Sequence, residues 1–312
     1  MAANVTRFVG YANSLRPFSV TSLSGRALRR GVRLARLTPA GRQIFPVQAK
    51  GLRFSGSARA CPVVDAEGAI ARLRELGAET DTFYVDASAF ARFLRDARFP
   101  KWYHPHNGTP TLSFLEKTLE HFVASRLLDV GSADTYLDVG ADSSPFSAIA
   151  ERLFGCRGYQ LDAAYRGGVH SRYIGSDVRH IPLASGSVSK MASHCAFDHF
   201  QGDADVAFIA ESARLLGNGG RLCIIPLYLS DETTNFIDPA ACLSLPTPDD
   251  NARLIDVTGW GYEFSRYYSP EDFLNLAATQ SDALSLRIYE IRGTDLVDPS
   301  CYLRLAAVFE RK

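Results

Sequence analysis

The sequence predicts an α/β fold: a doubly wound, mostly parallel seven-stranded sheet with helices on both faces. One observation is that short apolar runs alternate with helical segments from about residue 111 onward. Another is the run Arg221–Leu229, which is nearly all apolar, as a central parallel strand is. The third is a strand, a turn of small residues and a helix in succession around Gly140, an arrangement that lets a backbone approach a ligand closely.

Bulk composition sets broad limits. The 312 residues suffice for one large domain with additions, and 46% hydrophobic with 22% charged residues is ordinary for a soluble globular chain. The formal net charge is zero, so no specific nucleic-acid partner is predicted. No apolar run approaches the roughly 18 residues that span a bilayer. The six cysteines form no C-x-x-C pair, so we predict no metal site and a reducing, cytoplasmic location.

The charge is unevenly distributed along the chain. Residues 1–64 contain no Asp or Glu, although they contain ten arginines and one lysine. We expect this basic arm to be loosely ordered. A solvated tail, a weak contact with anionic lipid or phosphate, and an organellar presequence all remain open, and the last would place the protein in an organelle.

The remaining chain divides into an extension and a main domain. Residues 65–110 are expected to be a helical and aromatic extension that covers the site, with helices over 66–76 and 87–95. Residues 111–312 are expected to be the main domain. Within it, residues 230–268 form a polar and aromatic insertion on the substrate side.

The expected elements of the main domain follow from apolar periodicity, proline and glycine. The helix over 111–128 has Leu115, Leu119, Phe122 and Val123 on one face. Pro145 opens a second helix that ends near Phe154, and Ser269 caps a late one. A further helix covers 205–216. The expected strands are 136–139, 158–161, 172–175, 188–196, 221–229, 285–291 and 302–309, of which the last two form an antiparallel hairpin at the edge of the sheet.

The turn at Gly140 and the acid at Asp162 predict a ribose-binding site. Asp162 ends the second strand about twenty residues after the turn, where a carboxylate can accept hydrogen bonds from both ribose hydroxyls. A dinucleotide site requires G-x-G-x-x-G, whereas this turn has only Gly140. Asp138 and Asp142 would repel a pyrophosphate but would suit a sulfonium cation.

Five segments, in this order and spacing, resemble the class I S-adenosylmethionine-dependent methyltransferases, particularly their small-molecule branch. They are LDVG at 137–140, YQLD at 159–162, SDVRHIPL at 176–183, SHCAFDH at 193–199 and ARLLGNGGRL at 213–222. The resemblance implies a Rossmann-like methyltransferase fold and S-adenosyl-L-methionine as the cofactor. Two departures are visible: Asp142 and Ser144 occupy a region where the family usually has further glycines, and the link from Asp162 to Arg172 is too short for a full crossover helix.

The resemblance also implies roles for individual residues. Asp138 and Gly140, in the same loop as Asp142, would line the methionine part of the cofactor, and Asp162 would hold the ribose. Asp177 would bind the adenine amino group, and Val178 would lie against the ring. Ser193 and His194 would face the cofactor and the substrate.

The expected reaction is methyl transfer to a small hydroxylated metabolite, a sugar or a natural-product scaffold, most simply O-methylation. Such a reaction needs positioning and a base that takes the hydroxyl proton. His199 is the candidate base, His194 the second candidate, and Asp198 an orienting group or alternative base. Two other classes remain open: a non-catalytic binding subunit with a methyltransferase fold, and a nicotinamide-dependent oxidoreductase, which the missing glycines disfavour.

Overall fold

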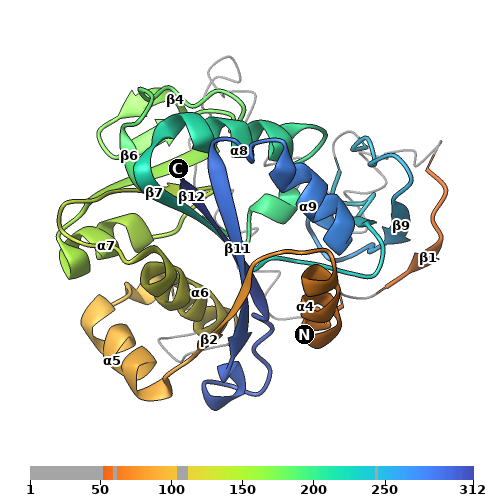
Figure 1. Cartoon of the computed structure of the whole chain (residues 1–312), viewed down its shortest axis with the longest axis horizontal. Helices are drawn as coiled ribbons and strands as arrows, with labels where there is room; N and C mark the ends of the chain where they lie inside the picture. The colour runs from red at the N-terminus through yellow and green to blue at the C-terminus, as the bar shows by residue number, and fades with distance from the viewer. Residues whose placement is uncertain (1–51, 59–61, 104–111, 243–244) are drawn as a thin grey trace, which may run out of the picture.

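A computed structural model describes residues 52–58, 62–103, 112–242 and 245–312 of the chain (Figure 1). Most of the basic arm, residues 1–51, lies outside the described residues, as do residues 104–111 of the aromatic stretch. In the part of the chain that is described, no helix is both long and apolar enough to cross a membrane.

The main sheet has eight strands and confirms the predicted fold class. In spatial order the strands are β2 (Thr80–Tyr84), β11 (Leu284–Arg292), β12 (Leu305–Arg311), β7 (Leu216–Ile225), β6 (Val188–His194), β3 (Thr135–Val139), β4 (Arg157–His170) and β5 (Tyr173–Gly175). β12 is antiparallel to both of its neighbours, so β11 and β12 form the expected hairpin. The additional strand is β2, which pairs in parallel with β11 and makes that hairpin internal.

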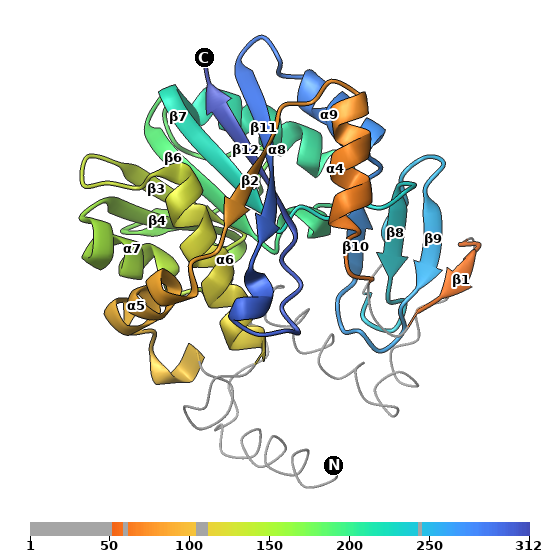
Figure 2. The ribbon, with the colours of Figure 1, turned by 60° about the horizontal axis from the view of Figure 1, so that its bottom comes forward.

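Helices cover both faces of this sheet, as a doubly wound fold requires. On one face, α5 (Ala87–Ala97), α6 (Leu112–Leu128) and α7 (Phe146–Phe154) share a buried cluster with the strands. On the other, α4 (Ala66–Glu75), α8 (Ala204–Leu215) and α9 (Pro270–Ala278) share a second cluster (Figures 1 and 2). The predicted cap of α9 is present, because the Ser269 hydroxyl accepts a hydrogen bond from the Asp272 N–H over 3.1 Å.

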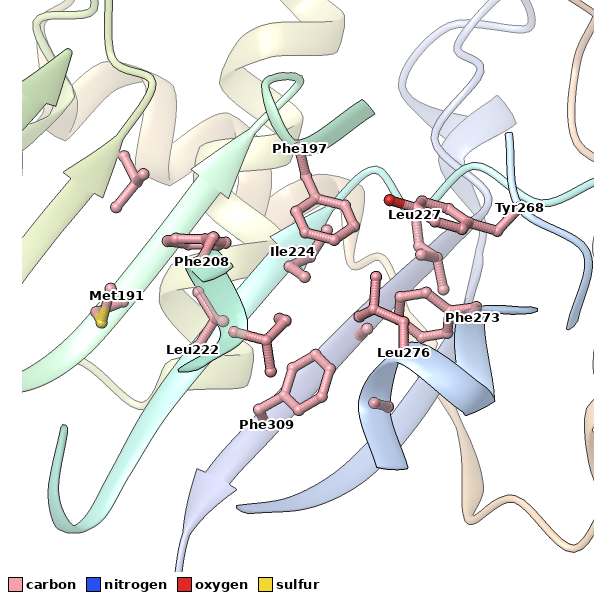
Figure 3. Close-up of a cluster of buried hydrophobic side chains, with 14 of the residues drawn as sticks. Met191, Phe197, Phe208, Leu222, Ile224, Leu227, Tyr268, Phe273, Leu276 and Phe309 are labelled. Carbon is pink, nitrogen blue, oxygen red and sulfur yellow. The ribbon is translucent and has the colours of Figure 1, made fainter. Parts of the chain in front are cut away.

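Alternation along the central strands divides the core between the two faces. On β7, Leu222 and Ile224 belong to the α8 and α9 side, whereas Cys223 and Ile225 belong to the α6 side. Figure 3 shows Leu222 and Ile224 with Phe273 and Phe309 between the strands and α9. Fully burying a side chain of this size stabilises the fold by about 1.5–3 kcal/mol.

The link between β4 and β5 has no crossover helix, which confirms the shortened connection expected there. Residues Gln160–Asp162 pair with Tyr173–Gly175, and after a register break Gly167–His170 pair with the same three residues. Gly175 is required at this place, because a Cβ on it would lie 1.9 Å from the Arg166 carbonyl oxygen. β4 therefore folds back on β5 at the edge of the sheet and does not lead into a helix.

The insertion forms a second, four-stranded sheet. It contains β8 (Thr234–Ile237), β9 (Arg253–Asp256) and β10 (Phe264–Tyr267), together with the two-residue strand β1 (Gly56–Ser57), in the order β1-β9-β8-β10 (Figure 2). β1 belongs to the stretch that the sequence assigns to the loose arm. That boundary is wrong at its end: the Ser55 N–H donates to the Leu254 carbonyl over 2.8 Å, and Phe54 packs against the cluster of Ile237, Cys242 and Phe264.

A buried arginine fixes the insertion to the main domain. Arg266 of β10 is 2% exposed, and its guanidinium forms ion pairs with Asp205 of α8 and Asp249 of the insertion. Its Nη1 also donates to the Tyr268 hydroxyl over 2.9 Å. Removing one partner of a buried pair typically costs about 3–5 kcal/mol, so the insertion is placed firmly beside the strand ends.

Candidate ligand site at the strand ends

The site lies where the order of the strands reverses. β4 and β5 follow β3 on one side of the sheet, and β7 lies on the far side of β6, so the reversal falls between β3 and β6. In open α/β sheets, ligands bind beyond the carboxyl ends of the strands at such a point. The ends of β3 and β6 bring together Asp138, Gly140, Ser193 and His194, four of the predicted site residues.

The turn after β3 requires glycine at its first position. Gly140 has φ +70°, and a Cβ on it would lie 2.4 Å from the Cβ of Ala196. The N–H groups of Gly140 and Ala141 both donate to the Leu161 carbonyl, over 2.9 and 3.1 Å. The turn is therefore held against β4 on one side and against the segment after β6 on the other.

Asp162 joins this turn to β4, which continues past the strand end expected at this residue as far as His170. Its Oδ2 accepts a hydrogen bond from the Asp142 N–H over 2.9 Å, and its Oδ1 accepts one from the Ala164 N–H over 2.7 Å. The Tyr165 hydroxyl donates to the Asp142 carbonyl. Each carboxylate oxygen can accept a further hydrogen bond, so Asp162 keeps the capacity to bind a diol.

Asp138 is a buried carboxyl group with an unused oxygen. It is 1% exposed, and its Oδ2 has no hydrogen-bond partner in the part of the chain that the structure describes. Burial raises the pKa of Asp138 to about 7, and the negative charge of Asp162 adds to the rise. A positive ligand group beside it would favour the ionised form, so this carboxyl group is suited to a cation.

Asp177 and Val178 follow β5 and differ in environment. The Asp177 carboxylate accepts from the Arg179 N–H over 2.9 Å and forms an ion pair with the Arg179 guanidinium at 3.1 Å. That guanidinium also pairs with Asp203 at 2.7 Å. Val178 is buried in the core. The predicted adenine-binding carboxylate is thus present and half-exposed, with a partner of its own.

The end of β6 holds two buried polar side chains. Ser193 is fully buried, and no described residue forms a hydrogen bond with its hydroxyl. The Nε2 atom of His194 lies 3.1 Å from the Tyr136 hydroxyl and 4.0 Å from Asp138 Oδ1. Burial lowers the pKa of His194 to about 3, and the charge of Lys117 contributes. His194 is therefore neutral at physiological pH.

His199 is oriented by the insertion. It ends the short 3₁₀ helix η3 (Phe197–His199), and its Nδ1 lies 2.6 Å from the Phe264 carbonyl oxygen of β10. Because a carbonyl only accepts, Nδ1 carries the proton and Nε2 keeps the basic lone pair. The ring stacks on Tyr262 at 5.1 Å and remains 30% exposed.

Asp198 lies beside that lone pair. Its Oδ2 is 3.7 Å from His199 Nε2 and accepts a hydrogen bond from the Ser265 hydroxyl over 2.7 Å. Its Oδ1 is buried without a hydrogen-bond partner. The three predicted catalytic residues are thus all near the end of β6, but only His199 combines exposure with a fixed basic nitrogen.

Sequence reasoning missed a set of polar residues on α6. Glu116, Glu120 and His121 are buried, although the sequence pattern predicts only an apolar stripe on this helix. The Glu120 Oε1 atom lies 3.4 Å from Lys117 Nζ and 3.1 Å from the sulfur of Cys195, directly after β6. The available signal was the spacing of Glu116 and Glu120, which places two carboxylates on the same helical face.

Among the described residues, no group of three His, Cys, Asp or Glu side chains is arranged to hold a metal ion. None of the described cysteines, Cys156, Cys195, Cys223, Cys242 and Cys301, forms a disulfide.

Comparisons with known proteins give similarity only among solved structures. No known family matches the sequence, and no curated protein matches it. The 1,6-didemethyltoxoflavin-N1-methyltransferase of Burkholderia thailandensis is 14% identical over 81% of this chain and 92% of its own, with a TM-score of 0.41. An S-adenosylmethionine-dependent methyltransferase of Mesorhizobium loti is 16% identical over 65% and 98%, with a TM-score of 0.42. The pyocyanin biosynthetic protein PhzM is 15% identical over 72% and 68%, with a TM-score of 0.41. The fold assignment therefore depends on the strand order of this chain itself.

Proposed function

We propose that the protein binds S-adenosyl-L-methionine and transfers its methyl group to a small hydroxylated metabolite, by O-methylation. The observation that supports this most directly is the group of carboxyl groups around the Gly140 turn at the strand reversal. Asp138 is buried with an unused oxygen, and Asp162 is fixed by two backbone N–H groups within the same turn region. A cationic nucleoside suits these residues better than a pyrophosphate does.

The residues of this chain fit that cofactor. Asp138, Gly140 and Asp142 would hold its methionine part, Asp162 its ribose, and Asp177 with Val178 its adenine. When bound, the cofactor would supply an electrophilic methyl group on a sulfonium. The task of the chain is then to place the acceptor oxygen about 3–3.5 Å from that carbon and in line with the sulfur.

His199 is the group we propose to take the acceptor proton. Its Nδ1 is fixed on the Phe264 carbonyl, which leaves Nε2 to accept a proton beside Asp198. The carboxylate would stabilise the imidazolium that forms. His194 is less suitable, because an imidazole with a pKa of about 3 is a weak base at neutral pH. We propose that His194 positions ligands and that Ser193 lines the same crevice.

A non-catalytic binding subunit is the second candidate. Asp177 has an internal partner in Arg179, and Asp142 uses its backbone N–H on Asp162, so parts of the ligand site are already satisfied within the chain. Such a protein would bind the cofactor weakly or not at all.

Thermal melting with two additions separates these three possibilities, because a ligand that binds the native state raises the midpoint. Stabilisation by S-adenosylhomocysteine supports the proposed function. Stabilisation by NAD(H) alone would indicate an oxidoreductase, and no response to either would favour the binding subunit. If S-adenosylhomocysteine binds, incubation of metabolite mixtures with isotope-labelled S-adenosylmethionine, followed by mass spectrometry, identifies the acceptor.

A further inference from the structure

Helix α6 buries charged side chains against the ends of β6 and β7. Glu116 and Glu120 have no exposed surface, whereas the Lys117 side chain is 33% exposed. Glu120 Oε1 has two neighbours, Lys117 Nζ at 3.4 Å and the Cys195 sulfur at 3.1 Å. Charged groups removed from water destabilise the fold unless they are fully paired. Packing alone therefore does not explain why these carboxyl groups are buried here.

The second oxygen of Glu120 is not paired. Glu120 Oε2 is buried and has no hydrogen-bond partner among the described residues, although an ionised carboxylate can accept about four hydrogen bonds. Buried polar atoms in folded proteins almost always have partners, and an exception marks a missing ligand or water. The Lys117 side chain is 33% exposed and its Nζ lies 3.4 Å from Glu120 Oε1, so this lysine is the exposed member of the cluster.

The position of Glu120 connects it to the strand-end site. Cys195 directly follows β6 with φ +45°, an uncommon conformation outside glycine, and its N–H donates to the Ile225 carbonyl over 2.9 Å. The same two elements also meet through their histidines, because the rings of His121 on α6 and His194 on β6 lie 4.3 Å apart. His194 in turn lies 4.0 Å from Asp138, the buried carboxyl group of the proposed cofactor site.

We propose that Glu120, with Lys117 at its rim, is the point at which the acceptor is recognised, and that the acceptor carries a protonated amine that donates to Glu120 Oε2. This inference extends the proposed function, since it adds an amino group to the hydroxylated acceptor. The amine would anchor the molecule on α6 and leave its hydroxyl free to reach the reaction centre.

The charges around Glu120 favour a cation over other ligands. Glu116 and Glu120 contribute two carboxylates, and Lys117 balances one of them. The Cys195 sulfur beside Glu120 lies 3.5 Å from the Tyr228 hydroxyl and 4.0 Å from the Tyr302 hydroxyl, which are neutral hydrogen-bonding groups. The carboxyl group of Asp198 contributes negative charge near Cys195 and Tyr228, as Glu116 does near Glu120. Burial raises the pKa of Glu120 to about 7 against the opposing effect of Lys117, and Glu116 raises it further. An ammonium group on Oε2 would stabilise the ionised carboxylate, whereas an anionic ligand would be repelled.

Three probes of similar size test the chemistry: benzylamine, benzyl alcohol and benzoate, each titrated by nuclear magnetic resonance with and without S-adenosylhomocysteine. At about pH 8 we expect benzylamine to bind about tenfold more tightly than benzyl alcohol, since charge-assisted hydrogen bonds are the stronger ones, and benzoate not to bind. Glu120→Gln should remove the preference for benzylamine. Glu75→Gln, on the exposed surface of α4, is the matched control and should preserve it.

A titration of the Asp138→Asn protein covers the case in which Glu120→Gln does not fold, because the pKa of Asp138 is also about 7 and its titration must be removed. Between about pH 6 and about pH 8 benzylamine stays protonated, while Glu120 passes from mostly neutral to mostly ionised, so affinity should rise about tenfold. Equal binding of the three probes, or benzylamine binding that ignores both pH and the Glu120→Gln change, would overturn the inference. Glu120-dependent benzylamine binding without any S-adenosylhomocysteine binding would sink the proposed function and leave this inference standing.

Discussion

The backbone N–H of Asp142 donates to the carboxylate of Asp162 over 2.9 Å, and this bond joins the turn after β3 to the point within β4 where its register with β5 breaks. Two segments that are twenty residues apart in sequence thereby become one structural unit. The same carboxylate also receives the Ala164 N–H, so its two oxygens are fixed in direction. A ligand diol would meet a carboxylate that needs no reorganisation.

Replacing this carboxylate is the most direct test of the cofactor site. We expect Asp162→Ala to weaken binding of S-adenosylhomocysteine by about 1.5–3 kcal/mol, the contribution of hydrogen bonds to a charged group. Calorimetric titration measures the change. Asp96→Ala on the exposed face of α5 is the control, and it should leave the dissociation constant unaltered. An unaltered constant for Asp162→Ala as well would remove the ribose role from this residue.

The turn at Gly140 combines two constraints, a left-handed backbone and the contact with Ala196. Gly140→Ala should lower the free energy of unfolding by about 2–5 kcal/mol, since a left-handed backbone costs about 1–2 kcal/mol and overpacking about 1–3 kcal/mol. Gly219→Ala separates the two effects, because Gly219 has φ +71° but nothing within 4 Å of its Cβ position. Denaturant unfolding should give a clearly smaller loss for Gly219→Ala. Equal losses would mean that the Ala196 contact is unimportant.

The role proposed for His199 predicts a separation of catalysis from binding. Once an acceptor is known, His199→Ala should lower turnover by about 10²- to 10⁴-fold, the usual contribution of a general base. Affinity for S-adenosylhomocysteine should stay at the wild-type value, since the ring contacts Phe264 and Tyr262 of the insertion. A variant with full turnover would leave positioning as the only contribution of this protein to the reaction.

The sheet was predictable from the sequence because its central strands are short, apolar and separated by strong helix signals. The central strand β7 (Leu216–Ile225) overlaps the expected run 221–229 but begins and ends earlier, and the landmarks around Gly140 and Asp162 lie at the strand reversal. β2 was not predictable, since Thr80–Tyr84 is half polar and its partner β11 lies about two hundred residues later. Pairing at that distance leaves no local trace in the sequence.

The polar interior of α6 shows a different limit. Apolar periodicity correctly predicts that Leu119, Phe122 and Val123 are buried. It says nothing about whether Glu116 and Glu120 face water, because burial of a charge depends on partners from other elements. Here those partners, Cys195 and the Tyr302 N–H, come from the ends of β6 and the approach to β12. The sequence therefore predicts the helix, but it does not predict which groups of other elements surround Glu116 and Glu120.

The revised boundary of the basic arm gives a paired truncation test. Deleting residues 1–51 should leave the cooperative melting transition intact. Deleting residues 1–59 should lower the melting temperature, because it removes β1, its hydrogen bonds to Leu254 and Asp256, and the packing of Leu52 and Phe54 on the second sheet. Differential scanning calorimetry compares the two proteins. Identical transitions would show that β1 adds nothing to stability.

The raised pKa of Asp138 predicts that this one group makes the free energy of unfolding depend on pH. The folded-state pKa is about 7 and the ordinary value is 3.8, so between these pH values the folded protein binds more protons at this site than the unfolded chain does. Stability from Asp138 is therefore greatest in acid, falls as pH rises through this window, and levels off above about pH 7. Between about pH 6 and about pH 8 the loss should amount to about 1.4 kcal/mol.

Asp138→Asn removes that titration while nearly keeping the shape of the side chain. The variant should gain about 1.4 kcal/mol relative to the wild type when the pH is raised from about 6 to about 8, as measured by urea unfolding at both values. Glu120 titrates in the same range in both proteins, so its contribution cancels in the comparison. The variant should also bind S-adenosylmethionine more weakly at about pH 8, because the carboxylate that faces the ligand cation is gone. A difference in stability that does not change with pH would show that Asp138 does not titrate between about pH 6 and about pH 8 in the folded protein.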